Sequence, residues 1–205
     1  MQSEHFIFES RDECSIIRLI SADRMNRLTL ARVQSLRTLM EELTEAPTTK
    51  TNCKPLIITG NDQYFSVGAD LNEVAALTPV NALDFAKSGQ ELMTLIDNFP
   101  APVYAAVSGY CMGGGLDLAL VCDFRVCGAN AVFGHRGASL GLITGWGGTQ
   151  RLASFVRRGK APQMFAGAEQ LRARDALEIG LISEIATGPL RRCFDLICDR
   201  TAKLD

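Results

Sequence analysis

The sequence contains few of the residues that bind metals in proteins. Its 205 residues include only two histidines, His5 and His135, and none of its seven cysteines forms a CxxC pair. Zinc sites take their ligands from histidine and cysteine side chains at short, paired spacings. We therefore expect no metal site, and we interpret the cysteines as small core residues whose thiols stay reduced.

Signals for export and for membrane insertion are also missing. The first residues, MQSEHFIFESRDE, lack the basic and apolar regions of a signal peptide. No uninterrupted apolar run is long enough to cross a bilayer. These features predict a cytoplasmic protein without a membrane partner.

Neither sign of charge predominates. Lysine and arginine number 21 against 23 aspartates and glutamates, which gives a formal net charge of -2. Nucleic acids and anionic membrane surfaces are bound through clustered positive charge, so we expect no nucleic-acid partner. The hydrophobic content of 47% is enough for the core of one α/β domain.

Apolar runs and helical periodicities alternate along the chain. Short apolar runs predict buried strands, and apolar residues three and four apart predict amphipathic helices. Strands are expected at 6–8, 15–20, 55–59, 103–107, 124–127, 132–133 and 181–185. Helices are expected at 30–43, 81–99, 113–122, 149–156, 161–166, 173–178 and 190–201, with loops at 60–70 and for much of 135–148. The alternation indicates an α/β fold with a mainly parallel sheet.

One predicted strand leads into a run of glycines that opens a helix. Three glycines at 113–115 follow the strand at 103–107, and Asp117 lies three residues after Gly114. The first N–H groups of a helix have no partner within it, so such a turn can hold an anion or a developing oxyanion. The alternative is a structural glycine turn in which Asp117 only interacts with the helix dipole.

A second turn of the same kind follows the strand at 55–59. There Gly68 and the small Ala69 again expose backbone N–H groups. N–H groups at the ends of two separate strands can converge on one carbonyl oxygen. The two turns together are therefore a candidate oxyanion hole.

Three segments of the chain form a specific pattern: FSVGADL, VSGYCMGGGLDLALVCDFRV and AVFGHRGASLGLITGWGGTQRL, in this order. The pattern resembles the crotonase superfamily, which includes enoyl-CoA hydratases and isomerases. The resemblance runs from residue 6 to 185 and implies an α/β superhelix of ββα units instead of a flat, doubly wound sheet. It divides the chain into an acyl-CoA-binding core, 1–187, and a short C-terminal helix, 188–205, where the family has trimerisation and lid helices.

In that family two backbone N–H groups polarise the thioester carbonyl of an acyl-CoA and stabilise its enolate. By motif position the resemblance places these groups on Ala69 and Gly114. It implies an acyl-CoA thioester as partner, with coenzyme A as part of the substrate and no separate cofactor. The expected function is that of an enoyl-CoA hydratase/isomerase-like lyase or isomerase of fatty acid metabolism.

The acid/base residues depart from the family pattern. Family hydratases use two glutamates; the first falls on Asp117, a shorter carboxylate, and the second on Gly137, which has no side chain. His135 either compensates, because histidine titrates near neutral pH, or is a structural residue at a strand end. Alternatives are therefore a thioester hydrolase, decarboxylase or isomerase on the same scaffold, or a non-catalytic acyl-CoA-binding homologue.

The resemblance also assigns the residues that would bind the substrate. Arg24 and Arg27 occupy the place of the family's nucleotide-binding loop and either meet phosphates of coenzyme A or remain solvated. Trp146 is expected in the wall of the acyl pocket, with a plain core position as the alternative. The backbone segment expected to contact adenine is Ser66, Val67 and Gly68.

The end of the sequence is short for this family. Only one short helix fits between residues 188 and 205, where family members usually continue with several. We expect a homotrimer or a dimer of trimers with a reduced interface, and a more open acyl pocket.

Overall fold

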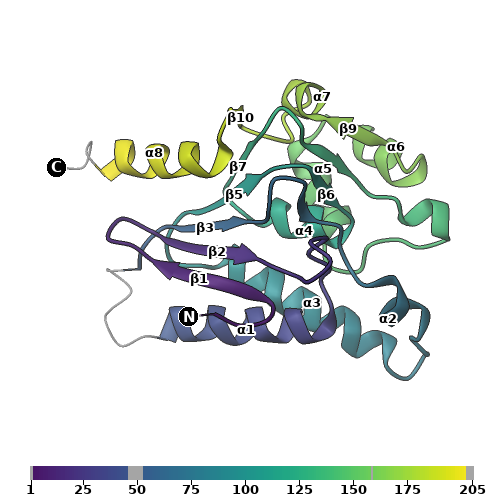
Figure 1. Ribbon diagram of the computed structural model, residues 1–205. Coiled ribbons are helices and arrows are strands. Elements are labelled where there is room, and N and C mark those ends of the chain that lie inside the picture. The colour runs from purple at the N-terminus through teal and green to yellow at the C-terminus, as the bar shows by residue number, and fades with distance from the viewer. Residues whose placement is uncertain (1, 46–52, 158, 202–205) are drawn as a thin grey trace.

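The computed structural model describes residues 2–45, 53–157 and 159–201. Its main sheet has six strands in the order β1-β2-β3-β5-β7-β10 (Figure 1). The first two strands form an antiparallel hairpin, and all later neighbours are parallel. The predicted α/β fold with a mainly parallel sheet is confirmed. The six strands are β1 (Phe6–Ser10), β2 (Ser15–Leu19), β3 (Leu56–Thr59), β5 (Val103–Val107), β7 (Phe124–Cys127) and β10 (Glu184–Ile185).

Four short strands form a second sheet in the order β4-β6-β8-β9. They are β4 (Tyr64–Ser66), β6 (Tyr110–Met112), β8 (Val132–Gly134) and β9 (Gln170–Arg172). Along the chain, β3, β5 and β7 are each followed by a strand of this second sheet and then by helix. This is the ββα repeat that the resemblance implied.

The sequence predictions omitted β4, β6 and β9. The prediction that 60–70 is a loop throughout is wrong, because β4 lies within it. Each of these strands has only three residues. Three residues are too few to show the alternation by which a strand is recognised, so pairing with neighbouring strands decides these segments.

Two long helices, α1 (Leu30–Glu45) and α3 (Ala82–Asp97), lie side by side against one face of the main sheet (Figure 1). Val33 and Met40 of α1 and Leu92 of α3 are buried in the same cluster as Ile58 of β3. Their spacing is the helical period that predicted both helices.

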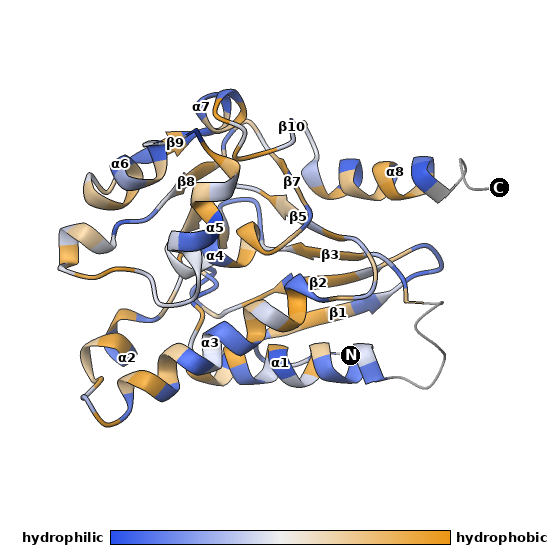
Figure 2. Ribbon diagram, turned by 180° about the vertical axis from the view of Figure 1, so that it is seen from behind, coloured by the Kyte–Doolittle hydropathy of each residue, from blue (hydrophilic) through white to orange (hydrophobic). Residues whose placement is uncertain are grey.

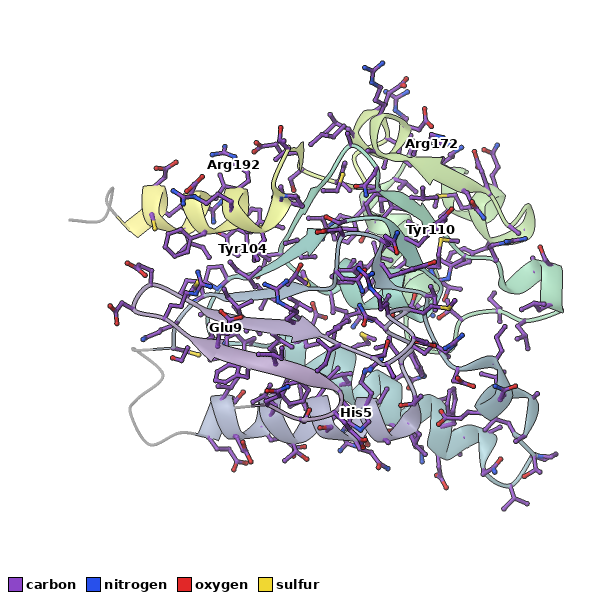
Figure 3. The ribbon with its side chains drawn as sticks, in the orientation of Figure 1. His5, Glu9, Tyr104, Tyr110, Arg172 and Arg192 are labelled. Carbon is purple, nitrogen blue, oxygen red and sulfur yellow. The ribbon has the colours of Figure 1, made fainter. Side chains whose placement is uncertain are left out.

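The helix α8 (Pro189–Thr201) covers the opposite face of the main sheet. Its Cys193 and Ile197 pack in one cluster with Ile57 and Tyr104. In Figure 3 Tyr104 lies beside α8, and Arg192 lies on the outer side of that helix. Figure 2 shows β3 and β5 in hydrophobic colours and α8 with alternating hydrophobic and hydrophilic stretches. Both sheet faces are buried, which is why the central strands appear in the sequence as continuous apolar runs.

The remaining helices are short. α4 is enclosed by β4, β6 and α5, and its residues from 115 to 120 are all buried. Asp117 is therefore carried into the interior of the molecule by its own helix. These elements are α2 (Leu71–Ala75), α4 (Gly114–Leu120), α5 (Gly148–Phe155), α6 (Lys160–Ala166) and α7 (Ala173–Glu178), with a 3-10 turn η1 (Gly137–Leu140).

All seven cysteines are free, and five of them are buried, as predicted for core residues. Burial raises the pKa of Cys127 and of Cys193 to about 12. Among the described residues, no helix combines the length and apolarity needed to cross a membrane. Within the same ranges, no three His, Cys, Asp or Glu side chains are grouped so that they could hold a metal ion.

Candidate active site

The turn after β4 carries Gly68 and Ala69. Gly68 has a φ of 87°, in the left-handed region that favours glycine. The hydroxyl of Ser66 accepts a hydrogen bond from the N–H of Gly68 at 3.1 Å and donates one to the carbonyl of Asn26 at 2.7 Å. Because Ser66 and Asn26 are both buried, these bonds hold the turn firmly against the loop at 21–27.

The turn that opens α4 lies directly against this first turn. A Cβ added at Gly68 would stand 2.8 Å from the nitrogen of Gly114, and one added at Gly114 would stand 3.5 Å from the nitrogen of Ala69. Across the part of the chain that the structure describes, the N–H groups of Ala69 and Gly114 donate no hydrogen bond. The fold thus brings together two unpaired donors from turns that are distant in the sequence.

Both donors border a cavity of about 520 Å³. Most of its wall is apolar and comes from α2, α3, β6 and the loop between β8 and α5. An apolar pocket with a few convergent polar groups is the usual form of a small-molecule site. Its apolar wall includes Val74, Leu77, Phe85, Met112, Leu142 and Ile143.

Trp146 is a core residue and a cavity wall at once. It is buried, yet it lines the cavity. Its ring centre lies 5.4 Å from that of Phe85. Two glycines make room for the indole: a Cβ at Gly114 would stand 2.6 Å from Cζ3, and a Cβ at Gly89 would overlap the ring nitrogen. The two interpretations of Trp146 that the sequence left open are therefore compatible.

Asp117 is fully buried, and both of its carboxylate oxygens face other side chains. The hydroxyl of Thr144 donates a short hydrogen bond to Oδ2. Oδ1 lies 3.2 Å from Nε2 of His135, a close contact without the alignment of a hydrogen bond. Asp117 lies behind Thr144 and His135, which line the cavity. Thr144 was not singled out from the sequence, because nothing local distinguishes it from other loop threonines.

His135 follows β8 directly and is only 4% exposed. Its ring centre lies 4.8 Å from the ring centre of Phe165 on α6. It lines the large cavity and also a neighbouring one of about 270 Å³. The sequence left open whether His135 compensates for the missing glutamate, and the structure places its imidazole against Asp117.

Gly137 starts η1, and the turn closes tightly around it. The N–H of Leu142 donates to the carbonyl of Gly137 at 2.8 Å. A Cβ added at Gly137 would stand 2.6 Å from the carbonyl oxygen of Leu142. The position that carries a glutamate in the family pattern thus has no room here for any side chain.

The loop expected to bind coenzyme A places its two arginines differently. Arg27 lines the cavity, but it forms an ion pair with Asp23, and its Nε lies 3.7 Å from Asp70. Arg24 has a positive φ of 64° and lies outside the cavity wall. In the backbone segment 66–68, which was expected to contact adenine, Val67 lines the cavity. Ser66 and Gly68 instead hold the turn through their hydrogen bond.

A buried arginine that the sequence analysis missed supports this loop. Arg32 of α1 donates short hydrogen bonds to the carbonyls of Arg27 and Ile20. Burial lowers its pKa to about 10. Its position within a regular amphipathic helix gave no signal that its side chain would turn inward.

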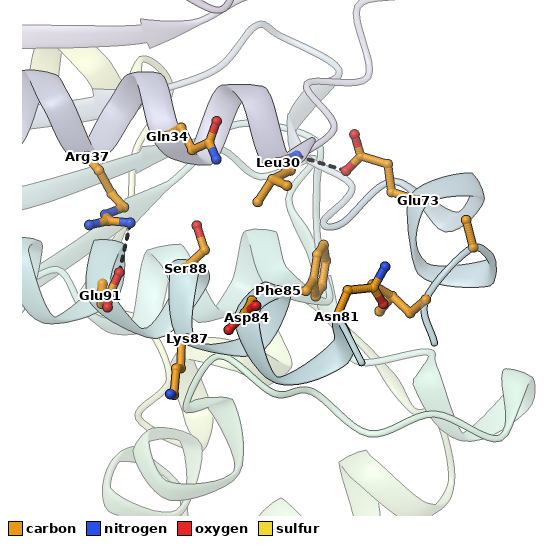
Figure 4. A pocket seen from close by; sticks show the side chains of 12 residues that line it. Leu30, Gln34, Arg37, Glu73, Asn81, Asp84, Phe85, Lys87, Ser88 and Glu91 are labelled. Atoms are coloured by element: carbon orange, nitrogen blue, oxygen red, sulfur yellow. Dashed lines mark hydrogen bonds and ion pairs between the residues drawn. The ribbon is translucent and has the colours of Figure 1, made fainter. Parts of the chain in front are cut away.

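A separate groove of about 540 Å³ runs between α1, α2 and α3 (Figure 4). Two contacts join polar groups within it. Glu73 accepts a hydrogen bond from the N–H of Leu30 at 2.8 Å, and Arg37 pairs with Glu91 at 2.8 Å. Neither Ala69 nor Gly114 lines this groove, so the cavity beside these two N–H donors is the candidate site.

The ββα superhelix and the paired glycine turns define a crotonase-fold protein. A profile of the family described as enoyl-CoA hydratase/isomerase matches residues 13–189. The chain belongs to this family, and the predicted enoyl-CoA hydratase/isomerase-like character is confirmed.

Named relatives agree with this assignment. The chain is 34% identical over 186 residues to the crotonyl-CoA hydratase of Syntrophomonas wolfei, covering 90% of this chain and 70% of that protein. It is 40% identical over 150 residues to the 2,3-dehydroadipyl-CoA hydratase of Escherichia coli, covering 73% of this chain and 58% of that protein. The crystal structure of an enoyl-CoA hydratase from Bacillus anthracis matches with a TM-score of 0.87 at 27% identity, over 95% of this chain and 76% of that one.

Proposed function

We propose that the protein binds an enoyl-CoA thioester and hydrates it through an enolate held by the N–H groups of Ala69 and Gly114. The observation that supports this proposal is the pair of adjacent, unpaired N–H donors beside an apolar cavity. One donor of this kind typically contributes about 2.7–4 kcal/mol to transition-state stabilisation. Asp117 is the buried carboxylate of the site and takes part in its acid/base chemistry.

The acyl group occupies the apolar cavity, with Trp146 as part of its wall. Coenzyme A is part of the substrate itself, and the proposed reaction uses no separate cofactor. The family resemblance supports Arg24 and Arg27 as partners of its phosphates and the backbone of 66–68 as the contact for its adenine, although Arg24 lies outside the cavity wall. The ion pairs of Arg27 with Asp23 and Asp70 mean that a phosphate would compete with carboxylates already present.

A second candidate is a non-hydrating activity on the same scaffold: thioester hydrolysis, decarboxylation or isomerisation. The closed turn at Gly137, which leaves no room for the second glutamate of the family pattern, favours this candidate. These reactions need the same oxyanion hole but a different arrangement of acid and base. A non-catalytic acyl-CoA-binding protein is the third candidate on the same observation.

Two further expectations concern the protein in the cell. We propose a cytoplasmic homotrimer or dimer of trimers. Leu140 and Ile143, exposed apolar residues at the cavity, support contact with a neighbouring subunit that would cover them. Light scattering of the purified chain measures the assembly, and a monomer at micromolar concentration would contradict it.

The test is turnover of a panel of enoyl-CoA thioesters, followed by loss of the conjugated thioester absorbance. Wild-type protein is expected to hydrate at least one of them, and Asp117→Ala is expected to be much slower. Mass spectrometry on saturated, branched and malonyl-type thioesters detects the second candidate. Calorimetric binding without any product identifies the third, and no binding of any CoA ester contradicts all three.

A further inference from the structure

The carboxylate of Asp117 does not reach the cavity itself. The hydroxyl of Thr144 donates a hydrogen bond to Oδ2, and Oδ1 faces Nε2 of His135 at 3.2 Å. Thr144 and His135 line the cavity, and Asp117 lies behind them. Thr144 and His135 are therefore the side chains in contact with Asp117 that also meet a molecule in the cavity. Of the two, only an imidazole readily takes up and releases a proton near neutral pH.

The two ring nitrogens of His135 have different surroundings. Nε2 is buried, and its nearest charged neighbour is the Asp117 carboxylate. A proton on Nε2 is favoured by that negative charge, which leaves the lone pair on Nδ1. The assignment of the tautomer rests on this contact. In this tautomer Nδ1 is the basic nitrogen of a ring that lines the cavity.

We infer that His135 is the catalytic residue that exchanges protons with the substrate, and that Asp117 is a positioning residue that acts through it. The inference rests on the proposed function and deepens it. In hydration, the water oxygen forms a bond to Cβ of the enoyl thioester. The π electrons of the C=C bond move to the thioester carbonyl as an enolate, and the water proton passes to Nδ1. The enolate then returns its electron pair to Cα, which takes that proton and leaves His135 neutral.

His135 carries a positive charge between the two proton transfers, and one buried carboxylate stabilises that charge. Among the described residues, Asp117 is the charged side chain in contact with the ring. α6 faces the ring with the apolar Phe165, and Lys160 at the start of α6 pairs with Glu169 at 2.7 Å instead. Arg136, the next residue in the chain, is exposed. Attraction between the imidazolium and Asp117 is strong because water is excluded from both groups.

The first experiment compares His135→Gln and Asp117→Asn with wild-type protein in crotonyl-CoA hydration. His135→Gln is expected to lower kcat by about 10²–10⁴-fold with little change in KM, because it removes the proton-transfer group. Asp117→Asn keeps an oxygen that can accept from Thr144, and it is expected to lower kcat with little change in KM. The matched control is His5→Gln, at the other histidine, which pairs with Glu4 away from the cavity.

The second experiment follows exchange of the Cα protons of butyryl-CoA in heavy water by proton NMR. It measures proton transfer to and from the enolate without requiring hydration. Wild-type protein and His5→Gln are expected to catalyse this exchange, and His135→Gln and His135→Asn are not. Circular dichroism and calorimetric binding of butyryl-CoA establish that each variant is folded and still binds.

The outcomes separate this inference from the proposed function. Hydration by wild-type protein with unchanged kcat in folded His135→Gln overturns the role of His135 and leaves the hydratase intact. Exchange without hydration, lost in His135→Gln, supports the role of His135 and contradicts the hydratase. Binding with neither exchange nor hydration in wild-type protein overturns both.

Discussion

Gly148 of α5 packs directly on the carboxylate of Asp117: a Cβ at Gly148 would overlap Oδ1 and stand 2.9 Å from Cγ2 of Thr144. The absence of a side chain at residue 148 is therefore part of what holds the carboxylate between Thr144 and His135.

Gly148→Ala is expected to displace the Asp117 carboxylate from His135 and to lower kcat by about 10²-fold, since a misplacement of about 1 Å costs that much. Hydratase kinetics and thermal unfolding measure the effect. Gly188→Ala is the control, because its Cβ would lie at an ordinary 3.7 Å from Arg191 Cβ. Unchanged kcat in folded Gly148→Ala would show that the position of Asp117 does not matter.

Gly137→Glu restores the family's second glutamate in sequence but is not expected to restore its function. The new Cβ would stand 2.6 Å from the backbone oxygen of Leu142, so η1 must open before the carboxylate finds a place. Overpacking of this kind typically costs about 1–3 kcal/mol. We expect a lower Tm and no gain in hydration, compared with Ser139→Glu on the exposed side of the same turn. A gain in kcat at unchanged Tm would refute this.

Gly68→Ala tests the alignment of the two N–H donors. A Cβ there would stand 2.7 Å from the carbonyl oxygen of Met112 and 2.8 Å from the nitrogen of Gly114, both of them backbone atoms. The φ of 87° adds strain for any residue with a Cβ. Because the turn must shift, kcat is expected to fall by about 10²–10³-fold, as for the loss of one oxyanion donor. Steady-state kinetics would contradict the proposed hole if kcat stayed at the wild-type value.

Gly89→Ala tests the packing of Trp146 in the cavity wall. Its Cβ would overlap the indole, so the single variant is expected to lose about 1–3 kcal/mol of unfolding free energy. Trp146→Ala removes the indole ring that a Cβ at residue 89 would overlap. In a double-mutant cycle measured by urea unfolding, the two changes are expected to couple favourably by about 0.5–3 kcal/mol. If the two changes in the free energy of unfolding were simply additive, residue 89 and the indole would not be in contact.

The buried thiols predict that the protein loses stability at alkaline pH. A free thiol ionises around its ordinary pKa of 9.0, whereas the folded chain holds the pKa of Cys127 and Cys193 at about 12. Above pH 9 the unfolded state therefore releases protons that the folded state keeps. The free energy of unfolding falls by about 1.4 kcal/mol per pH unit for each thiol, and no loss from this source occurs below pH 9.

Urea unfolding under reducing conditions from pH 7.5 to 10.5 measures this slope. Cys193→Ala is expected to reduce this slope by about 1.4 kcal/mol per pH unit, the contribution of one proton, whatever its effect on stability at neutral pH. An unchanged slope would show that Cys193 does not keep its proton in the folded state.

Much of the fold could be predicted from the sequence because its signals are local. The apolar runs of β3 and β5 and the helical spacing in α1 and α3 are long enough to identify each element alone. Local pattern does not extend to strands of three residues such as β4, which form only when a neighbouring strand supplies hydrogen-bond partners. The ββα superhelix followed from motif resemblance and not from periodicity.

The sequence by itself assigned the proposed donors to Ala69 and Gly114 through motif positions that resemble the crotonase superfamily, and glycine at 68 and at 113–115 permits the close backbone approach that such a site needs. Only the tertiary structure decided that the two turns touch, that Asp117 faces His135 and Thr144 instead of the cavity, and that the turn at Gly137 has no room for a side chain. These are distances between elements separated along the chain, and they depend on how the two sheets pack around α4. The physical reason is that side-chain chemistry is a property of the residue, whereas the partner it meets is a property of the packing.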